Sequence, residues 1–177
     1  FNKPEIISKT VEINMNQSYS GCSIPVIIER ITIYNNEKRL EQETIYVKIP
    51  QGIDNNEIIT ISEKGNIVNN IKGDIKIIIK IKNSTNLERK GLDILYKQTI
   101  TLKEALCGVC FDLPHLNGKI YKINNDVGSI IQPGYKKIIP NMGFKRENDI
   151  GNLIIEFLVQ FPEKINKEDI NKLKDIL

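Results

Sequence analysis

Apolar and polar residues alternate along several stretches of this chain, which is the pattern of strands with one buried face. Ile45, Val47 and Ile49 alternate with more polar neighbours over 44–49. Isoleucine recurs at every second position of 75–81, and apolar residues do so along 153–161. Asn35-Asn36-Glu37-Lys38 separates two apolar runs and predicts a hairpin connection. The pattern therefore predicts a mostly β chain.

Helical signals are confined to two short segments. Thr101 and Glu104 form a capping-box pattern over 101–106. Near the end of the chain, Asn166 suits the N-cap of a helix, and Ile170, Leu173 and Leu177 would share one face of it. We therefore expect one short helix inside the β region and one at the C-terminal end.

Landmarks in the first half of the chain recur in the second. Met15 and Gly21 return as Leu102 and Gly108, each 87 positions later. In both halves a Pro/Gly turn, a second glycine and a Gly-polar pair follow in the same order, and the pair starts a long alternating strand. This order predicts two copies of one small β domain. We place them at 1–85 and 86–163, with a separate tail helix at 164–177.

Composition sharpens this picture. The 177 residues include 35 Ile, 20 Asn and 21 Lys but a single Ala, which favours strands and turns over a helix bundle. The net charge of +3 comes from interspersed Lys and Glu without interleaved aromatic residues, so we expect no nucleic acid partner. No apolar run approaches the roughly 18–20 residues of a membrane span, so we expect no membrane partner. Because the chain opens at Phe1 rather than at a methionine, we expect either a processed product or, in preference, a fragment of a longer protein.

Candidate chemistry is sparse. The one histidine, His115, has no carboxylate pattern around it and is interpreted as a loop or strand-end residue rather than a catalytic base. Cys107 and Cys110 form a CxxC pair, but zinc would need two further ligands and only Cys22 and His115 remain. We expect buried or half-buried free thiols, which suit a reducing compartment. No enzyme, catalytic residue, metal site or cofactor is predicted, with a thiol oxidoreductase as a remote alternative.

An apolar strand is the more informative feature. Ile24, Val26 and Ile28 point to one face, and Pro25 between them lacks an N–H and suits an edge strand. Val11 lies in a short alternating run upstream that would fit beside it. Such an edge suits the addition of an extended peptide as a further strand. The same residues would also serve as the core of a small domain, and pattern alone favours that second interpretation.

Ten blocks of sequence, in order, resemble the C-terminal region of type II (zinc-less) DnaJ co-chaperones, the heat shock protein 40 family. The blocks are Tyr19-Ser20-Gly21-Cys22, 47–53, Gly73-Asp74-Ile75, 87–94, 102–108, 116–119, 131–134, 141–144, Gly151-Asn152-Leu153 and Phe161-Pro162. The resemblance covers essentially the whole chain. The family's repeated CxxCxGxG zinc module and the His-Pro-Asp triplet of the J domain do not occur in it.

The resemblance implies two tandem small β-sandwich-like domains, each with a short helix, followed by a C-terminal helix. It implies a hydrophobic peptide groove formed by Val11, Ile24, Val26, Ile28 and Leu87. Many type II members carry basic residues where this chain has Ile24 and Pro25, and those residues are implicated in holding the acidic tail of the partner chaperone. Here Lys9 or Lys48 would have to substitute for them.

The same resemblance implies a cytoplasmic homodimer that binds unfolded client polypeptides and delivers them to a DnaK-type (heat shock protein 70 family) ATPase. The residues implied in dimerisation are Phe161, Pro162, Ile170, Leu173, Ile176 and Leu177. The alternative is a structural assembly module whose apolar edge and tail helix serve one fixed protein partner.

Overall fold

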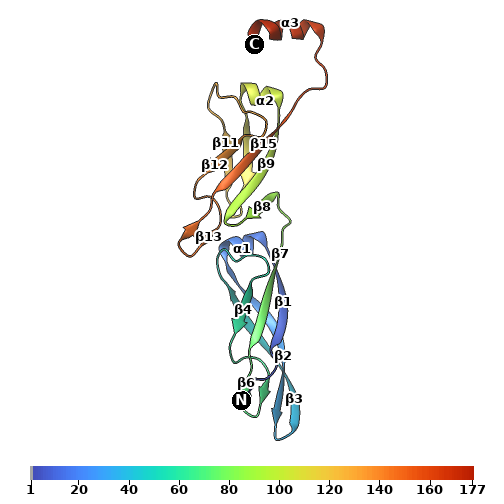
Figure 1. Ribbon diagram of the computed structural model, residues 1–177, viewed down its shortest axis with the longest axis vertical. Helices are drawn as coiled ribbons and strands as arrows, with labels where there is room; N and C mark the ends of the chain where they lie inside the picture. Colours follow the sequence, from blue (N-terminus) through green and yellow to red (C-terminus); the bar gives the residue numbers. More distant parts are fainter. Residues whose placement is uncertain (1) are drawn as a thin grey trace. The chain divides into compact units, whose positions relative to one another are not determined.

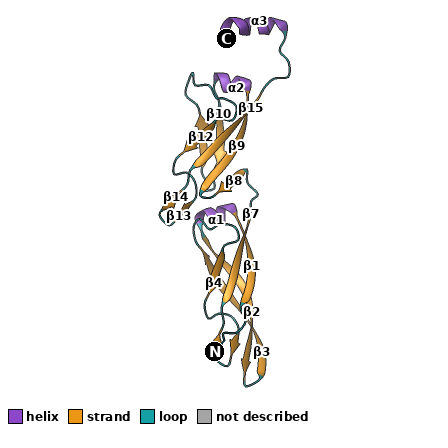
Figure 2. Cartoon of the chain, in the orientation of Figure 1, coloured by secondary structure: helices purple, strands orange, loops and turns teal. Residues whose placement is uncertain are grey.

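The computed structural model describes residues 2–177, which fall into two compact units. The first unit runs from the start of the described chain to Thr85 and includes Phe144–Ile150. The second comprises Asn86–Gly143 and Gly151–Leu177. Strands dominate both units (Figures 1 and 2), which confirms the predicted fold class. None of the helices in the described residues is long and apolar enough to cross a membrane.

Two sheets and one short helix build the first unit. One sheet has the strand order β1-β7-β4 and the other β3-β2-β5-β6. The elements are β1 (Ile7–Asn14), α1 (Met15–Ser20), β2 (Cys22–Tyr34), β3 (Glu37–Ile49), β4 (Ile58–Ile61), β5 (Ile67–Val68), β6 (Ile71–Lys72) and β7 (Ile75–Lys82). β2 and β3 form an antiparallel hairpin, as predicted. Its turn residues Asn35 and Asn36 both have positive φ, which asparagine tolerates better than most residues.

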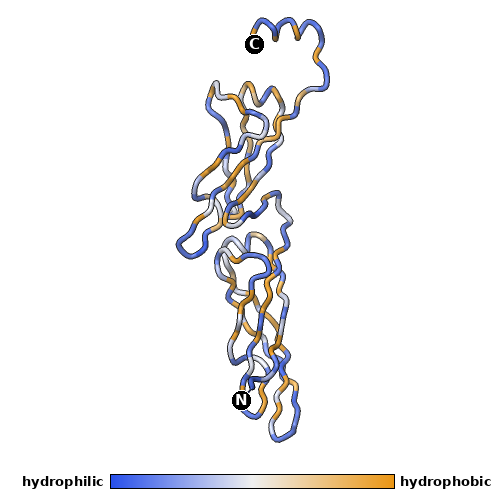
Figure 3. The backbone as a smooth tube through the Cα atoms, viewed as in Figure 1, coloured by the Kyte–Doolittle hydropathy of each residue, from blue (hydrophilic) through white to orange (hydrophobic). Residues whose placement is uncertain are grey.

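Isoleucine fills the core between these two sheets. Ile75, Ile77 and Ile79 of β7 are fully buried and join one hydrophobic cluster with Ile28 and Val47 from the facing sheet. Along the strands, apolar residues alternate with polar ones (Figure 3). Each buried side chain of this size contributes roughly 1.5–3 kcal/mol. Much of the isoleucine excess therefore stabilises the fold itself.

The second unit repeats this plan in a smaller form. Its elements are β8 (Leu87–Lys90), β9 (Asp93–Thr101), α2 (Leu102–Cys107), β10 (Cys110–Pro114), β11 (Ile120–Asn124), β12 (Lys136–Ile139), β15 (Leu153–Gln160) and α3 (Lys167–Ile176). One sheet has the order β12-β15-β9-β8, and β10 pairs with β11. Phe157 lies in the core, where its ring contacts those of Phe111 and Tyr135 at 6.1 Å between centroids.

Each unit has a short helix at the equivalent position, and both helices have the same type of N-terminal cap. Thr101 and Glu104 form the predicted capping box at α2, and Asn14 and Gln17 form a second one at α1 that was not predicted. In each unit the strand before the helix runs parallel to the long strand near the end of the repeat, β1 with β7 and β9 with β15. The 87-residue offset of the sequence landmarks is therefore an offset between equivalent elements.

The short hairpin of β13 (Lys145–Arg146) and β14 (Asp149–Ile150) departs from the sequence boundaries. Its sequence position lies within 86–163, but it groups with the first unit. Phe144 is fully buried there against Tyr19, with 5.6 Å between ring centroids, and Arg146 forms an ion pair with Glu57. Gly52, at φ 82°, makes room for this segment, since a Cβ would lie 2.4 Å from the Lys145 carbonyl oxygen.

Candidate functional site

Strand β2 has one unpaired edge along its first half. One side of β2 pairs with β3 over its whole length, whereas β5 contacts the other side only at Thr32 and Ile33. The side chain of Asn66 covers the next position, because its Oδ1 accepts a hydrogen bond of 2.8 Å from the Ile31 N–H. Among the described residues, no strand pairs with 22–29 on that side. This stretch is therefore an open strand edge.

Two hydrogen bonds fix which backbone groups face the open edge. The Ile31 N–H donates to Asn66, and the Ile33 carbonyl accepts from the Asn69 N–H at 2.8 Å, so both residues point away from β3. Successive residues of an antiparallel strand face opposite edges, and the register of β2 with β3 is continuous. The residues that present their backbone to the open edge are therefore Ser23, Pro25, Ile27 and Glu29.

Pro25 interrupts this edge without weakening the hairpin. It lies opposite Tyr46 of β3, at a pair whose backbone groups face outward on both sides. Its missing N–H therefore removes no bond to β3, which is where a proline is tolerated in a sheet. Toward the open edge Pro25 offers only its carbonyl, whereas Ile27 two residues later offers both a donor and an acceptor. As a whole β2 lies between β3 and β5, but Pro25 falls in the half of β2 that pairs with β3 alone.

Four of the five predicted groove residues lie together in the first unit. Val11, Ile24, Val26 and Ile28 belong to, or pack against, the same hydrophobic cluster. Val11 and Ile24 are partly exposed, but Val26 and Ile28 are only 8% and 0% exposed. Their side chains point into the sandwich and leave a ligand little surface, and their role in a peptide groove stays a prediction. Val26 and Ile28 anchor β2 to the hydrophobic core.

The fifth predicted residue, Leu87, lies outside the first unit. It lies in β8 of the second unit, opposite Tyr96 of β9, and is 3% exposed. Its side chain is part of the core of the second unit, and its role in the peptide groove stays a prediction. The apolar residue that is accessible at that edge is Ile27, which is 53% exposed. Alternation places Ile27 on the face of β2 opposite to Ile24, Val26 and Ile28, so the sequence pattern does not select it as a groove residue.

Charges near the edge serve two different purposes. Arg30 is buried, and its guanidinium bonds the Glu43 carboxylate, the Glu41 carboxylate at 3.4 Å and the Lys64 carbonyl at 3.1 Å. The Arg30 hydrogen bond and charge hold the pKa of Glu43 below its usual value. Arg30 is thus a structural cation. Lys48 is exposed and lies directly opposite Ser23, one strand from the open edge.

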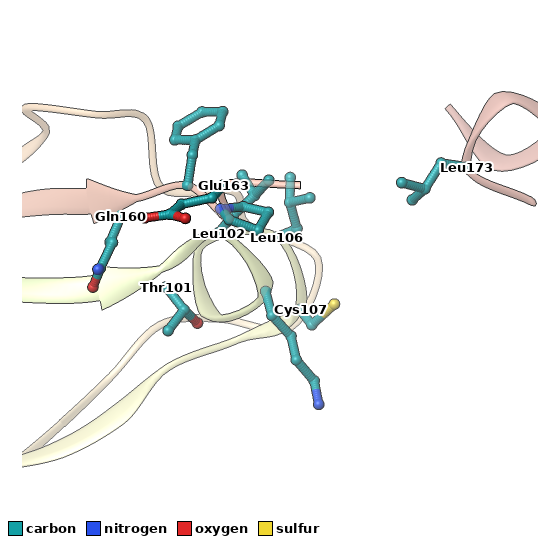
Figure 4. Close-up of a pocket in the computed structure, with 10 residues that line it drawn as sticks. Thr101, Leu102, Leu106, Cys107, Gln160, Glu163 and Leu173 are labelled. Atoms are coloured by element: carbon teal, nitrogen blue, oxygen red, sulfur yellow. The ribbon is translucent and has the colours of Figure 1, made fainter. Parts of the chain in front are cut away.

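A second candidate surface lies in the second unit, where α2 meets the end of β15. A groove of about 610 Å³ is lined there by apolar side chains including Leu102, Leu106, Phe161 and Pro162. Leu173 of α3 also lines it and projects toward the α2 side (Figure 4). The groove thus brings together three of the residues implied in dimerisation, and it adds Leu102 and Leu106, which the sequence analysis did not select.

Helix α3 has an apolar face without a covering partner among the described residues. None of its residues is buried, and Ile176 and Leu177 are strongly exposed. Asn166 caps the helix as predicted, with its Oδ1 accepting from the Asp169 N–H at 2.8 Å. A helix of this length is marginal by itself in water, so its apolar face calls for a partner surface.

The histidine is held by structural hydrogen bonds. His115 is buried, its Nδ1 accepts from the Asn117 N–H at 3.1 Å, and its Nε2 lies 2.8 Å from the Met142 carbonyl oxygen. Since a carbonyl only accepts, Nε2 carries the proton and donates it. Both ring nitrogens are occupied in holding the loop, as expected for a strand-end histidine.

The cysteines differ from the expectation in one respect. All three are free, but Cys107 and Cys110 are exposed rather than buried or half-buried. Cys107 ends α2 and Cys110 begins β10, on either side of Gly108 and the buried Val109. Cys22 is partly exposed, and burial raises the pKa of its thiol. In the part of the chain that the structure describes, no group of three or more His, Cys, Asp or Glu side chains is placed to hold a metal ion.

Comparison with known proteins identifies the architecture. The DnaJ C terminal domain family matches residues 7–162. DnaJ protein homolog 1 of Allium porrum is 31% identical over 154 residues, which cover 84% of this chain and 39% of the relative. DnaJ homolog subfamily B member 5 of Homo sapiens is 29% identical over 174 residues, which cover 94% of this chain and 49% of the relative. The chain therefore spans less than half of either relative, and it belongs to the DnaJ C-terminal domain family.

Proposed function

We propose that this chain is the client-binding part of a DnaJ-type co-chaperone, which holds exposed apolar segments of unfolded polypeptides by strand addition at the β2 edge. The observation that carries the proposal is the open edge at 22–29, which packs on a hydrophobic cluster and includes the exposed Ile27. An added strand gains backbone hydrogen bonds that every sequence can make, so such a site accepts many clients.

The mechanism is reversible burial and requires no covalent step. Hydrogen bonds at this edge contribute only about 0.5–1.5 kcal/mol each, so a single edge binds weakly and releases quickly. Fast release suits transfer of the client to a DnaK-type ATPase, which we propose as the partner. Lys9 or Lys48 takes the place of the basic residues that other family members use for the acidic tail of that partner. The three free cysteines fit a cytoplasmic location.

A proline exchange at Ile27 tests the edge directly. Its N–H faces the open side, so Ile27→Pro removes a peptide contact without breaking a bond to β3. Ile27→Ala removes the same side chain but keeps the N–H, which makes it the matched control. We expect anisotropy titration of a labelled apolar peptide to show about two- to tenfold weaker binding for Ile27→Pro than for Ile27→Ala. Equal affinities in the two folded variants would contradict the proposal.

The alternative of a fixed assembly partner makes a different prediction. Such a module would form one saturable complex and ignore unfolded polypeptides. Competition by a reduced, carboxymethylated protein separates the two functions. A co-chaperone fragment releases the labelled peptide when this competitor is added, whereas an assembly module retains its partner.

We propose further that α3 makes the chain a homodimer by placing its apolar face on a second copy. The exposed face of α3 and the apolar groove beside α2 support this. Leu173→Asp places a charge on that face, and Asn171→Asp places the same charge on an exposed position of the same helix. We expect sedimentation equilibrium to give a monomer mass for Leu173→Asp and a dimer mass for Asn171→Asp. A dimer mass for both would overturn the proposal.

A further inference from the structure

The β2–β3 hairpin has a second open edge, on the outer side of β3. Because even-numbered residues of β2 bond to odd-numbered residues of β3, the even-numbered residues of β3 face away from β2. Toward the outer side, the backbone is presented by Thr44, Tyr46 and Lys48. Strand β3 ends its sheet, and no described strand pairs with it there.

This edge borders a groove of the length and composition that an extended peptide requires. The groove, of about 500 Å³, is lined on one side by the six consecutive residues 43–48 of β3. Six residues of extended chain span about 20 Å. Ile59 and Ile61 of β4, at the edge of the other sheet, line the opposite side together with Lys64, and both isoleucines are only partly buried. An added strand would thus place every second side chain on an apolar floor.

The outer edge of β3 is more complete than the open edge of β2. The cross-strand pair Pro25–Tyr46 shows the difference, since Pro25 lacks the donor that Tyr46 presents on the other side of the hairpin. Tyr46 is 74% exposed, so its ring is available beside an added strand. Of the two edges, only that of β3 offers an uninterrupted run of alternating donors and acceptors.

Charge at the rim defines the kind of peptide. Lys48 and Lys64 are both exposed and line the groove. The one acidic residue of the lining, Glu43, is already bonded to Arg30. The lining therefore holds two lysines against one carboxylate, and this positive balance favours acidic residues between the apolar ones.

From these observations we propose that the outer edge of β3, with the groove it shares with β4, is a second strand-addition site. Its occupant is an extended peptide in which apolar and acidic residues alternate. Apolar side chains lie on Ile59 and Ile61, acidic ones reach Lys48 and Lys64, and the peptide backbone pairs with Thr44, Tyr46 and Lys48. The site uses no backbone group of the β2 edge, so strand addition at either edge can occur without the other.

The test uses a fluorescein-labelled heptapeptide in which Val alternates with Asp. Tyr46→Pro removes the outward N–H of β3 and leaves the bonds to β2 intact, whereas Tyr46→Ala removes the ring alone. We expect the affinity of Tyr46→Pro to be at least fivefold lower than that of Tyr46→Ala, and Ile27→Pro to bind this peptide as the wild type does. Equal binding by the two Tyr46 variants would overturn the proposal. Loss of binding in Ile27→Pro alone would place the peptide at the β2 edge and also overturn it.

Two further measurements keep the test decisive if Tyr46→Pro misfolds. In the wild type, saturating heptapeptide is expected to slow hydrogen exchange at the Tyr46 and Lys48 amides at least tenfold, and unchanged exchange there contradicts the proposal. Lys64→Glu is expected to weaken binding of the acidic peptide, and Lys72→Glu, an equal charge change on the exposed strand β6, is not. Equal losses of affinity in both variants would mean that the peptide responds only to the net charge of the protein, and this would contradict the proposed site.

Discussion

Pro25 limits how tightly the open edge of β2 can bind a peptide, because it lacks an N–H donor. Pro25→Ala restores an N–H on the open side of β2 without changing the bonds to β3. The restored donor is worth about 0.5–1.5 kcal/mol, so we expect two- to tenfold tighter binding of a labelled apolar peptide by anisotropy titration. Thr99→Ala, at an exposed position of β9 in the second unit, is the control and should leave the affinity unchanged. If Pro25→Ala also leaves it unchanged, the peptide does not pair with β2 at this position.

Two carboxylates make the first unit sensitive to acid. The Arg30 hydrogen bond lowers the pKa of Glu43, and the Glu63 N–H, followed by Lys3, lowers that of Asp74. A group with a lowered folded pKa adds stability above its unfolded pKa and loses it as the pH falls through the folded pKa. Stability is therefore expected to fall on acidification below the ordinary carboxyl range.

Urea unfolding as a function of pH checks this expectation. Glu43→Gln should flatten the acid limb of the unfolding free energy, because the substituted amide no longer titrates. Glu29→Gln, on the outer face of β2, is the control and should retain the slope of the wild type. A Glu43→Gln variant with an unchanged acid limb would show that the Arg30–Glu43 pair contributes nothing to the pH dependence.

At the scale of elements, sequence pattern predicted what depends on local periodicity. The alternation at 44–49, 75–81 and 153–161 corresponds to β3, β7 and β15, because each strand has one face in a core and one in water. The capping box of α2 was recognised, but Asn14 and Gln17 carry the same signal for α1 and were overlooked. With glutamine in place of glutamate, the α1 box lacks the charge that makes the pattern conspicuous.

The β13–β14 hairpin belongs to the first unit for a reason that no local pattern reveals. Phe144 and Arg146 follow an ordinary turn, and their partners Tyr19 and Glu57 lie more than eighty residues earlier in the chain. Phe144→Ala should therefore loosen the first unit. Removing a buried Phe costs about 3–5 kcal/mol. We expect faster hydrogen exchange at α1 and at 50–58 in the full chain.

Phe157 offers the matched control for that measurement. It is a buried phenylalanine of β15 in the core of the second unit. Phe157→Ala should raise exchange in β9 and β15 and leave α1 as in the wild type. If Phe144→Ala also raises exchange only in the second unit, the hairpin is not an element of the first.

At the scale of the whole molecule, the family and the fold could be predicted from the sequence, whereas the groups accessible to a ligand could not. Alternation selected Ile24, Val26 and Ile28 as one apolar face, but whether a face is covered depends on the opposing sheet, and β1 and β7 bury Ile28 completely. The accessible features are instead backbone groups of an edge. Their direction is set by the partner strand β3 and by Asn66, which no single-residue pattern encodes.

Weak edges gain strength when two of them act together. If α3 joins two copies, a polypeptide with two apolar segments can bind both β2 edges, and the second contact becomes intramolecular. We expect a peptide carrying two apolar segments on a sufficiently long Gly/Ser linker to bind the wild type roughly a hundredfold more tightly than the single segment does.

A series of linker lengths separates this avidity from a larger single site. Affinity should rise sharply once the linker spans the two edges and then fall slowly as it lengthens. Leu173→Asp should abolish the gain while leaving single-segment binding unchanged, and Asn171→Asp should retain it. Ile27→Pro should weaken both peptides, because each segment depends on the same edge. A double-segment peptide that binds Leu173→Asp as tightly as the wild type would mean that both segments lie on one chain, and the two-copy clamp would have to be abandoned.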